Sequence, residues 1–309
     1  MKRLRLLLIV TMVGLTLNCG SNPKTKDQPA HLTAGMQAMH KGIAAYQHGC
    51  YRRSLDHLLR AHEAFAASDQ LEGVAMSMNN IGNVYRFIGD PESAHLFFDQ
   101  AIAMYLELHD EDGALQALSN KAALLIDINE LNAAQETLQR ADQLLGEQKA
   151  TASLLNTKGV LSLKQHAYDE AEALLKQGLD RLSDDDPVGV ATLNFSLGRL
   201  MVATNRLDLA REYFETALQT DRKLGFHKGI ADDLAAIGDI YLTQGQFQSA
   251  AAYLQRSIKI YALIENQERV EAILQKLQQA AAEADLDIRV TELFVKRWLD
   301  GKIIQGPCH

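Results

Sequence analysis

Small and large apolar residues recur together along the chain at intervals of 37 to 40 residues. Each unit has a small anchor residue, in turn Gly42, Gly82, Ala122, Gly159, Gly198 and Gly238. A second small residue follows twelve positions later, at Ser54, Ala94, Ala134, Ala171, Ala210 and Ala250. A large apolar residue stands sixteen positions after the anchor, at Leu58, Phe98, Leu138, Leu175, Phe214 and Leu254. Small residues let two backbones approach closely, so the pattern predicts six units of crossed, paired helices in a repeat architecture.

The residue seven positions after each anchor predicts a turn inside the unit. These residues are Gly49, Gly89, Asn129, His166, Asn205 and Gly245, and all but His166 are Gly or Asn. Gly and Asn tolerate the left-handed backbone that ends a helix. Two residues further on, a second helix is expected to begin, at Tyr51, Pro91, Leu131, Tyr168, Leu207 and Phe247.

The units resemble the tetratricopeptide repeat (TPR) family, whose first helix carries L-G-x-x-Y and whose second carries A-x-x-x-F-x-x-A. The second unit reads IGNVY at Ile81–Tyr85, followed by Ala94, Phe98 and Ala101. The resemblance implies an all-α TPR superhelical solenoid of helix-turn-helix repeats. The 40-residue spacing is similar to that of the longer TPR subtype.

After the six units, two more helices are expected to cap the solenoid. Gln267–Ala284 has apolar residues at helical spacing and would cover the last apolar face. Val290–Leu299 is a second amphipathic helix, interpreted as an extra cap or, alternatively, as a docking peptide. The predicted organisation is therefore a six-repeat solenoid with its cap helix over 31–284, then a C-terminal helix and tail over 285–309.

The N-terminus has the pattern of an export signal. Three basic residues precede an apolar run over Leu6–Leu17, which is too short to span a bilayer. Cys19 follows directly and resembles the lipidated cysteine of bacterial lipoproteins, although Asn18 precedes it. We predict a signal peptide over 1–18, lipid attachment at Cys19 and a linker over 19–30. The alternative is an ordinary cleaved signal peptide with an unrelated cysteine.

Charge and cysteine content limit the partners. The net charge is −8, and removal of 1–18 takes away three basic residues and no acidic one, which makes it −11. An acidic surface argues against nucleic acid, so membrane association is expected through the lipid anchor alone. Cys50 and Cys308 are expected to lie far apart in an elongated solenoid, so no intramolecular disulfide is predicted.

The sequence contains no motif for catalysis, for a cofactor or for a metal. It lacks the phosphate-binding loop, the nucleophile elbow, the zincin motif and the dinucleotide fingerprint. Histidines gather in the first unit, but His57 and His62 are five residues apart and so lie on different sides of a helix. The prediction is a protein without catalytic, cofactor-binding or metal-binding residues.

The resemblance implies a peptide- or protein-binding groove lined by the first helix of each unit. Its residues offer amides for an extended backbone and Met, Tyr and Phe side chains for apolar groups. The candidate groove residues are Met39, Tyr46, Met76, Asn79, Asn80, Asn83, Arg86, Phe87, Asn120, Asn156, Lys164, Phe195 and Arg199. The alternative is a wettable surface without a dedicated ligand.

These features favour a non-enzymatic scaffold or adaptor that binds a protein or an extended peptide. The lipid anchor would place it in the bacterial cell envelope, at the outer membrane and facing the periplasm. A second interpretation is a soluble periplasmic TPR sensor that binds a signalling peptide, for which Cys19 would not be needed.

Overall fold

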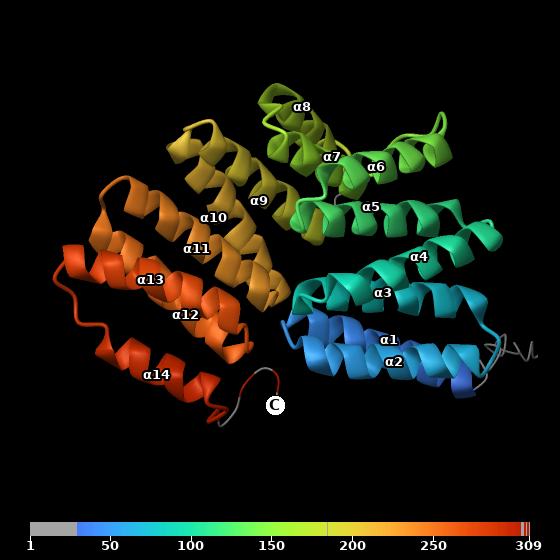
Figure 1. Ribbon diagram of the computed structural model, residues 1–309, viewed down its shortest axis with the longest axis horizontal. Helices are drawn as coiled ribbons and strands as arrows, with labels where there is room; N and C mark the ends of the chain where they lie inside the picture. Colours follow the sequence, from blue (N-terminus) through green and yellow to red (C-terminus); the bar gives the residue numbers. More distant parts are fainter. Residues whose placement is uncertain (1–29, 184, 304–305, 307, 309) are drawn as a thin grey trace, which may run out of the picture.

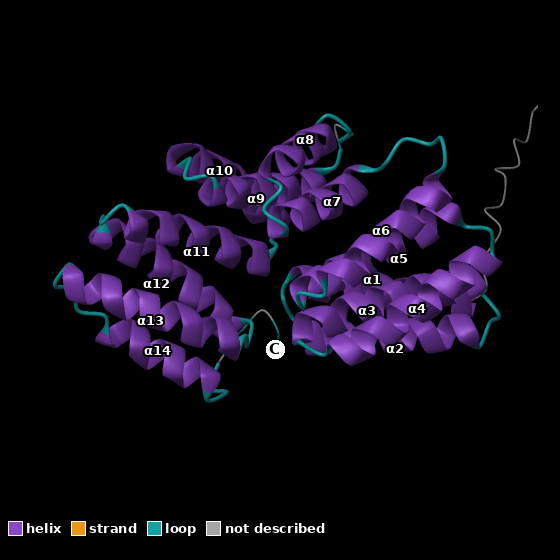
Figure 2. Ribbon diagram, turned by 45° about the horizontal axis from the view of Figure 1, so that its top comes forward, coloured by secondary structure: helices purple, strands orange, loops and turns teal. Residues whose placement is uncertain are grey.

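A computed structural model describes residues 30–183, 185–303, 306 and 308, and within them it forms an α-helical solenoid (Figure 1). Helices follow one another in antiparallel pairs, and the described residues contain no strand (Figure 2). The pairs are α1 (Ala30–Gln47) with α2 (Tyr51–Ala66), α3 (Leu71–Ile88) with α4 (Pro91–Glu107), α5 (Glu111–Asp127) with α6 (Leu131–Leu145), α7 (Ala152–Lys164) with α8 (Tyr168–Leu179), α9 (Pro187–Ala203) with α10 (Leu207–Leu224), and α11 (His227–Thr243) with α12 (Phe247–Leu263). Two further helices follow the six pairs, namely α13 (Gln267–Glu283) and α14 (Arg289–Leu299).

The turn inside each pair has the left-handed residue that the sequence predicts. The φ angles of Gly49, Gly89 and Gly245 are 74°, 86° and 70°. Asn129 and Asn205 have φ angles of 64° and 58°, and the non-glycine His166 adopts 61° as well. The second helix of each pair then begins at the residue predicted from the sequence, from Tyr51 to Phe247. Helix type and turn position are therefore confirmed.

The anchor glycines are required by the close crossing of the paired helices. A Cβ at Gly82 would lie 2.8 Å from the ring of Phe98, and one at Gly198 would lie 2.6 Å from Phe214. The second small position is equally tight: the hydroxyl of Ser54 donates a 2.7 Å hydrogen bond to the Gly42 carbonyl oxygen. The alanines at this position are fully buried, at Ala94, Ala134, Ala171, Ala210 and Ala250.

The last two helices close the C-terminal end of the solenoid. Val270, Ile273 and Leu277 of α13 are buried against α12, which confirms the predicted cap. Helix α14 packs on α12 and buries Val295, so in this structure it also acts as a cap. Its opposite face leaves Val290 and Leu293 each 66% exposed.

The solenoid curls (Figure 1) until the turn of its first pair meets the start of α11 and the end of α12, and a disulfide joins Cys50 to Cys308. The prediction that these cysteines stay apart is therefore wrong. It assumed an elongated solenoid, whereas accumulated curvature brings the α1–α2 turn back to the C-terminal end. The sequence separation is 258 residues, and the two Cα atoms lie 5.1 Å apart.

Non-covalent contacts accompany this disulfide. The rings of Tyr46 and Phe226 stack with centroids 6.4 Å apart. His227 Nδ1 lies 3.1 Å from the carbonyl oxygen of His48, and the two imidazoles are 5.1 Å apart. We call these contacts, together with the Cys50–Cys308 disulfide, the clasp.

The predicted signal peptide, Cys19 and all but the last residue of the predicted linker lie outside the described residues. Within the described part of the chain, no helix has the length and apolar character needed to cross a membrane.

Candidate binding surface on the inner face of the solenoid

The first helices of the pairs line the inner face of the curl. The first helix of each pair contacts the first helix of the next pair, from α1 with α3 to α9 with α11. The second helices of neighbouring pairs contact each other less. The second helices therefore lie on the outer side. All predicted groove residues belong to first helices, namely α1, α3, α5, α7 and α9.

The predicted groove residues differ in how far they are exposed to solvent. Lys164 is exposed, whereas Met39 is only 2% exposed and packs in the core of the first two pairs. Phe195 packs against Phe214 of α10, with ring centroids 5.3 Å apart. The other predicted residues apart from Asn79 are partly exposed, and they are Tyr46, Met76, Asn80, Asn83, Arg86, Phe87, Asn120, Asn156 and Arg199.

The predicted amides of α3 and α5 form a hydrogen-bonded row. Asn120 Nδ2 donates to Asn79 Oδ1 at 3.0 Å, and Gln116 Nε2 donates to Asn120 Oδ1 at 3.2 Å. Asn79 is 8% exposed, so its role here is to join the two helices. On α7, Asn156 Oδ1 is buried and has no hydrogen-bond partner among the described residues. A buried carbonyl oxygen without a donor is costly, which makes Asn156 ready to accept one.

Aromatic residues from α1, α2 and α3 gather beside the clasp. Phe87 stacks on Tyr51 with centroids 5.7 Å apart and meets Tyr46 edge-on at 5.5 Å. Two cations lie near the Phe87 ring: Arg86 at 5.1 Å and, from α11, Lys228 at 5.0 Å. Phe87 therefore connects the two ends of the curl as well as lining its inner face. Burial raises the pKa of both tyrosines above the ordinary value, so both phenols are neutral.

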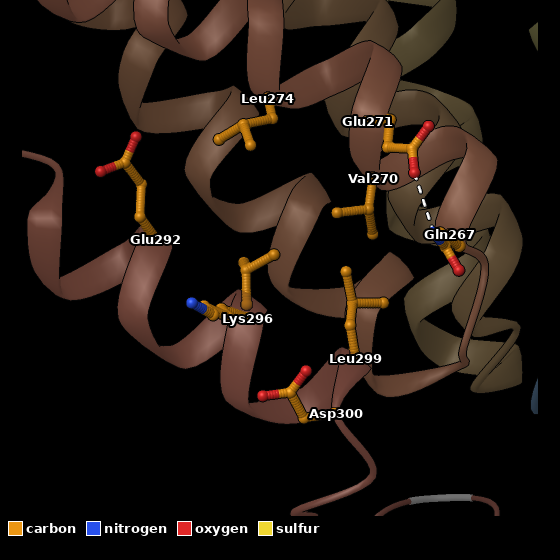
Figure 3. A pocket seen from close by; sticks show the side chains of 9 residues that line it. Gln267, Val270, Glu271, Leu274, Glu292, Lys296, Leu299 and Asp300 are labelled. Carbon is orange, nitrogen blue, oxygen red and sulfur yellow. Dashed lines mark hydrogen bonds between the residues drawn. The ribbon is translucent and has the colours of Figure 1, made fainter.

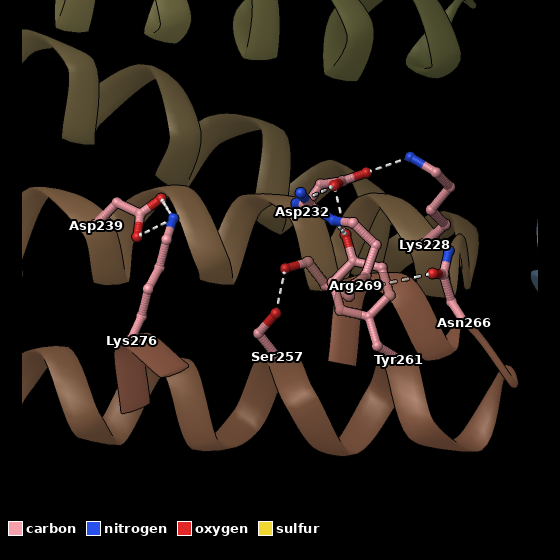
Figure 4. Close-up of polar contacts among 9 residues, drawn as sticks. Lys228, Asp232, Asp239, Ser257, Tyr261, Asn266, Arg269 and Lys276 are labelled. Carbon is pink, nitrogen blue, oxygen red and sulfur yellow. Dashed lines mark hydrogen bonds and ion pairs between the residues drawn. The ribbon is translucent and has the colours of Figure 1, made fainter. Parts of the chain in front are cut away.

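A second polar group lies on the C-terminal side of the inner face, around Asp232 of α11 (Figure 4). Its carboxylate accepts from Lys228 Nζ at 2.5 Å, from Arg269 at 3.1 Å and from the Tyr261 hydroxyl. Burial alone would raise the pKa of Asp232. The charge of Lys228 and the hydrogen bonds that Asp232 accepts from Lys228 and Tyr261 instead hold this pKa below the ordinary value. No sequence pattern predicts this group, because its members come from three different helices.

Arg199 of α9 differs from the other inner cations. Arg86 pairs with Asp127 at 2.6 Å and Lys228 pairs with Asp232, whereas Arg199 has neither a hydrogen bond nor an ion pair within the described residues. Burial lowers the pKa of its guanidinium, and the charges of Asp127 and Asp232 oppose that shift. A partly buried guanidinium without a partner carries a desolvation cost that an anionic ligand would offset.

A hollow of about 390 Å³ lies away from the inner face, between α13 and α14 (Figure 3). Its apolar wall comes from both helices, and polar groups such as Glu271, Glu292 and Lys296 surround it. No metal-binding group of three or more His, Cys, Asp or Glu residues occurs in the described part of the chain.

Comparisons with known proteins agree with this geometry. The sequence model of the tetratricopeptide repeat family matches residues 36–107 and 189–262, which fall in the first two and in the fifth and sixth helix pairs. No curated protein shows significant sequence similarity to the chain.

The solved structures that share the fold include two Rap structures. One is a Rap protein complexed with competence and sporulation factor, with a TM-score of 0.58, 15% identity, and coverage of 84% of this chain and 78% of the other. The other is the Rap conjugation gene regulator of the plasmid pLS20 in complex with the Phr* peptide, with a TM-score of 0.59, 14% identity, and coverage of 90% and 82%. At these identities the likeness concerns the fold, which is a TPR-like solenoid.

Proposed function

We propose that the chain is a non-enzymatic binding protein that holds an extended peptide, or an extended segment of a protein, on the inner face of its solenoid. The observation that carries this proposal is the unpaired Arg199, which lies on the same face as the unpartnered Asn156 Oδ1. Together they offer a charge for a carboxylate and an acceptor for a backbone N–H. The two Rap structures, of which one contains the Phr* peptide, support a peptide ligand by likeness of fold.

We further propose that the protein is exported and is tethered through Cys19 in the bacterial envelope. The apolar run before Cys19 supports export. The Cys50–Cys308 disulfide supports an oxidising compartment independently, because disulfides persist there and are rare in the cytosol. A soluble periplasmic sensor for a signalling peptide is the second candidate, and the closed curl favours it, since a ligand could act by changing the closure.

The binding proposal is tested with a synthetic mixture of random hexapeptides that carry free C-terminal carboxylates. Immobilised wild-type protein is compared with Arg199→Gln, and retained peptides are quantified by mass spectrometry. A charge-assisted hydrogen bond contributes about 1.5–3 kcal/mol. The variant should therefore retain at least roughly ten-fold less peptide than wild type does. The control is Arg211→Gln on the outer helix α10, where Arg211 pairs with Glu215 at 3.1 Å. Equal retention by wild type and Arg199→Gln contradicts the role of Arg199.

A further inference from the structure

The clasp brings together residues from three separate parts of the chain. The α1–α2 turn contributes Tyr46, His48 and Cys50, and the start of α11 contributes Phe226 and His227. Cys308 comes from the tail that follows α14. The turn between α12 and α13 adds Ile264, whose side chain would lie 3.0 Å from a Cβ at Gly49. Contact across the opening of the curl therefore depends on few side chains.

The non-covalent part of the clasp is weak by its composition. It consists of two ring contacts and one hydrogen bond to a backbone carbonyl, and beside it lie the packing of Ile264 on Gly49 and the cation–π contact of Lys228 with Phe87. Each contact of this kind contributes little to stability when it is exposed to water, and contributes more when it is desolvated. His48 is exposed, and Phe226, His227 and Lys228 are only partly buried. The disulfide is the only covalent bond between the two ends within the described residues.

The contacts across the curl share side chains with the proposed binding surface. Tyr46 and Phe87 line the inner face and at the same time contact Phe226 and Lys228 of the opposite end. An extended ligand that uses these two side chains must displace those contacts. Closure of the curl and ligand access to this part of the inner face therefore compete.

We propose that the Cys50–Cys308 disulfide is a redox-controlled latch that holds the curl closed and restricts access to the inner face. This inference rests on the proposed function, since it concerns regulation of the same surface. The partner in the reaction is a dithiol. Cys50 is 4% exposed and Cys308 is partly exposed, so the attacking thiolate reaches the sulfur of Cys308.

The exchange has two balanced steps. Attack forms a mixed disulfide on Cys308 and breaks its bond to Cys50, which leaves as a thiolate and takes up a proton. The second thiolate of the reagent then attacks the reagent's own sulfur and releases Cys308. The chain gains two electrons and two protons, and the dithiol becomes a disulfide.

The test compares the oxidised chain, the chain reduced with dithiothreitol and the Cys308→Ser variant. Small-angle X-ray scattering measures the radius of gyration, and hydrogen exchange follows the backbone over 46–51 and 226–230. Circular dichroism checks that the helices persist, so that opening is distinguished from unfolding. Dithiothreitol added to Cys308→Ser is the matched control, because that variant has no latch to reduce.

Reduced protein and Cys308→Ser are expected to have a larger radius of gyration and faster exchange in both segments. Retention of the random hexapeptides should rise about ten-fold if the open state rises from roughly a tenth of the population to most of it. Unchanged scattering and exchange overturn the latch, whatever the peptides do. Opening without a gain in retention overturns the control of access. Opening with no peptide retained by any form instead overturns the proposed function and leaves the latch standing.

Discussion

Cys50 and Cys308 are bonded to each other although 258 residues separate them. Nearly all of the described solenoid lies within the loop that this bond closes. In a solenoid each unit contacts mainly its neighbours, so the ends are normally independent of each other. The disulfide removes that independence because it connects the first helix pair to the tail that follows the last helix.

The first prediction concerns stability. Replacing Cys308 with Ser should lower the free energy of unfolding by about 2–5 kcal/mol, because a closed loop of this length restricts the unfolded chain. Urea unfolding followed by circular dichroism measures the change under oxidising conditions. Addition of dithiothreitol should lower the wild-type midpoint to that of the variant and leave the variant unchanged. Equal midpoints for oxidised wild type and variant would show that the bond does not stabilise the fold.

The second prediction concerns the crossing of paired helices. Ala210 is fully buried where α10 crosses α9, so Ala210→Leu should overpack the junction and destabilise the protein by roughly 1–3 kcal/mol. Hydrogen exchange should increase most in α7 to α12, because neighbouring units share the junction. Ala252→Leu is the matched control, since Ala252 on α12 is exposed. Similar thermal midpoints for the two variants would contradict the helix register.

The sequence predicts the local parts of this fold well. The pairing of Gly82 with Phe98 follows from a spacing of sixteen residues, and the turn at Asn129 follows from residue type. These features are set by residues close in sequence, and the 40-residue recurrence repeats them six times. A small rotation between successive pairs is not visible in such a pattern, although it decides where the ends of the solenoid lie.

The candidate site is accordingly predictable only in part. Asn83, Phe87 and Arg199 are found from their position in the repeat, and all three are partly exposed on inner helices. The contact of Phe87 with Lys228 depends on the curl, because 141 residues separate the two positions. Long-range pairs of this kind leave no periodic signal.

The third prediction concerns the lipid anchor. If Cys19 carries the lipid, Cys19→Ala should release the mature protein into the soluble fraction or block its processing. Fractionation of cells and gel migration measure the two outcomes, and Cys50→Ser serves as a control because it removes a different cysteine. A Cys19→Ala protein that fractionates and migrates as wild type does would favour the ordinary signal peptide and with it the soluble sensor.

The last prediction concerns pH and a buried acid in α11. Asp233 is 1% exposed, and neither carboxyl oxygen has a hydrogen-bond partner within the described residues. Burial, with the charges of Asp221 and Asp232, raises the pKa of Asp233 to about 9. Burial, followed by the charge of Asp232, raises the pKa of Asp221 to about 7.

The sign of the pH effect follows from proton uptake. At neutral pH the folded chain keeps the Asp233 proton, whereas the unfolded chain, with an ordinary pKa of about 4, has lost it. Folding therefore binds a proton, and stability should fall as pH rises from about 4 toward 9. Asp233→Asn places a neutral amide of similar shape at this position, so its stability should decline less over that range. At pH 8 we expect the variant to be more stable than wild type by about 1 kcal/mol or more, since each pKa unit corresponds to about 1.4 kcal/mol.

Urea unfolding at pH 5, 6.5 and 8 measures this dependence. Asp208→Asn on α10 is the control, because Asp208 is exposed and should change none of the three midpoints appreciably. If Asp233→Asn loses stability equally at all three values, the Asp233 carboxyl is ionised in the folded protein and a partner neutralises it. A midpoint difference that grows steadily with pH, in favour of the variant, is the result that a buried protonated Asp233 requires.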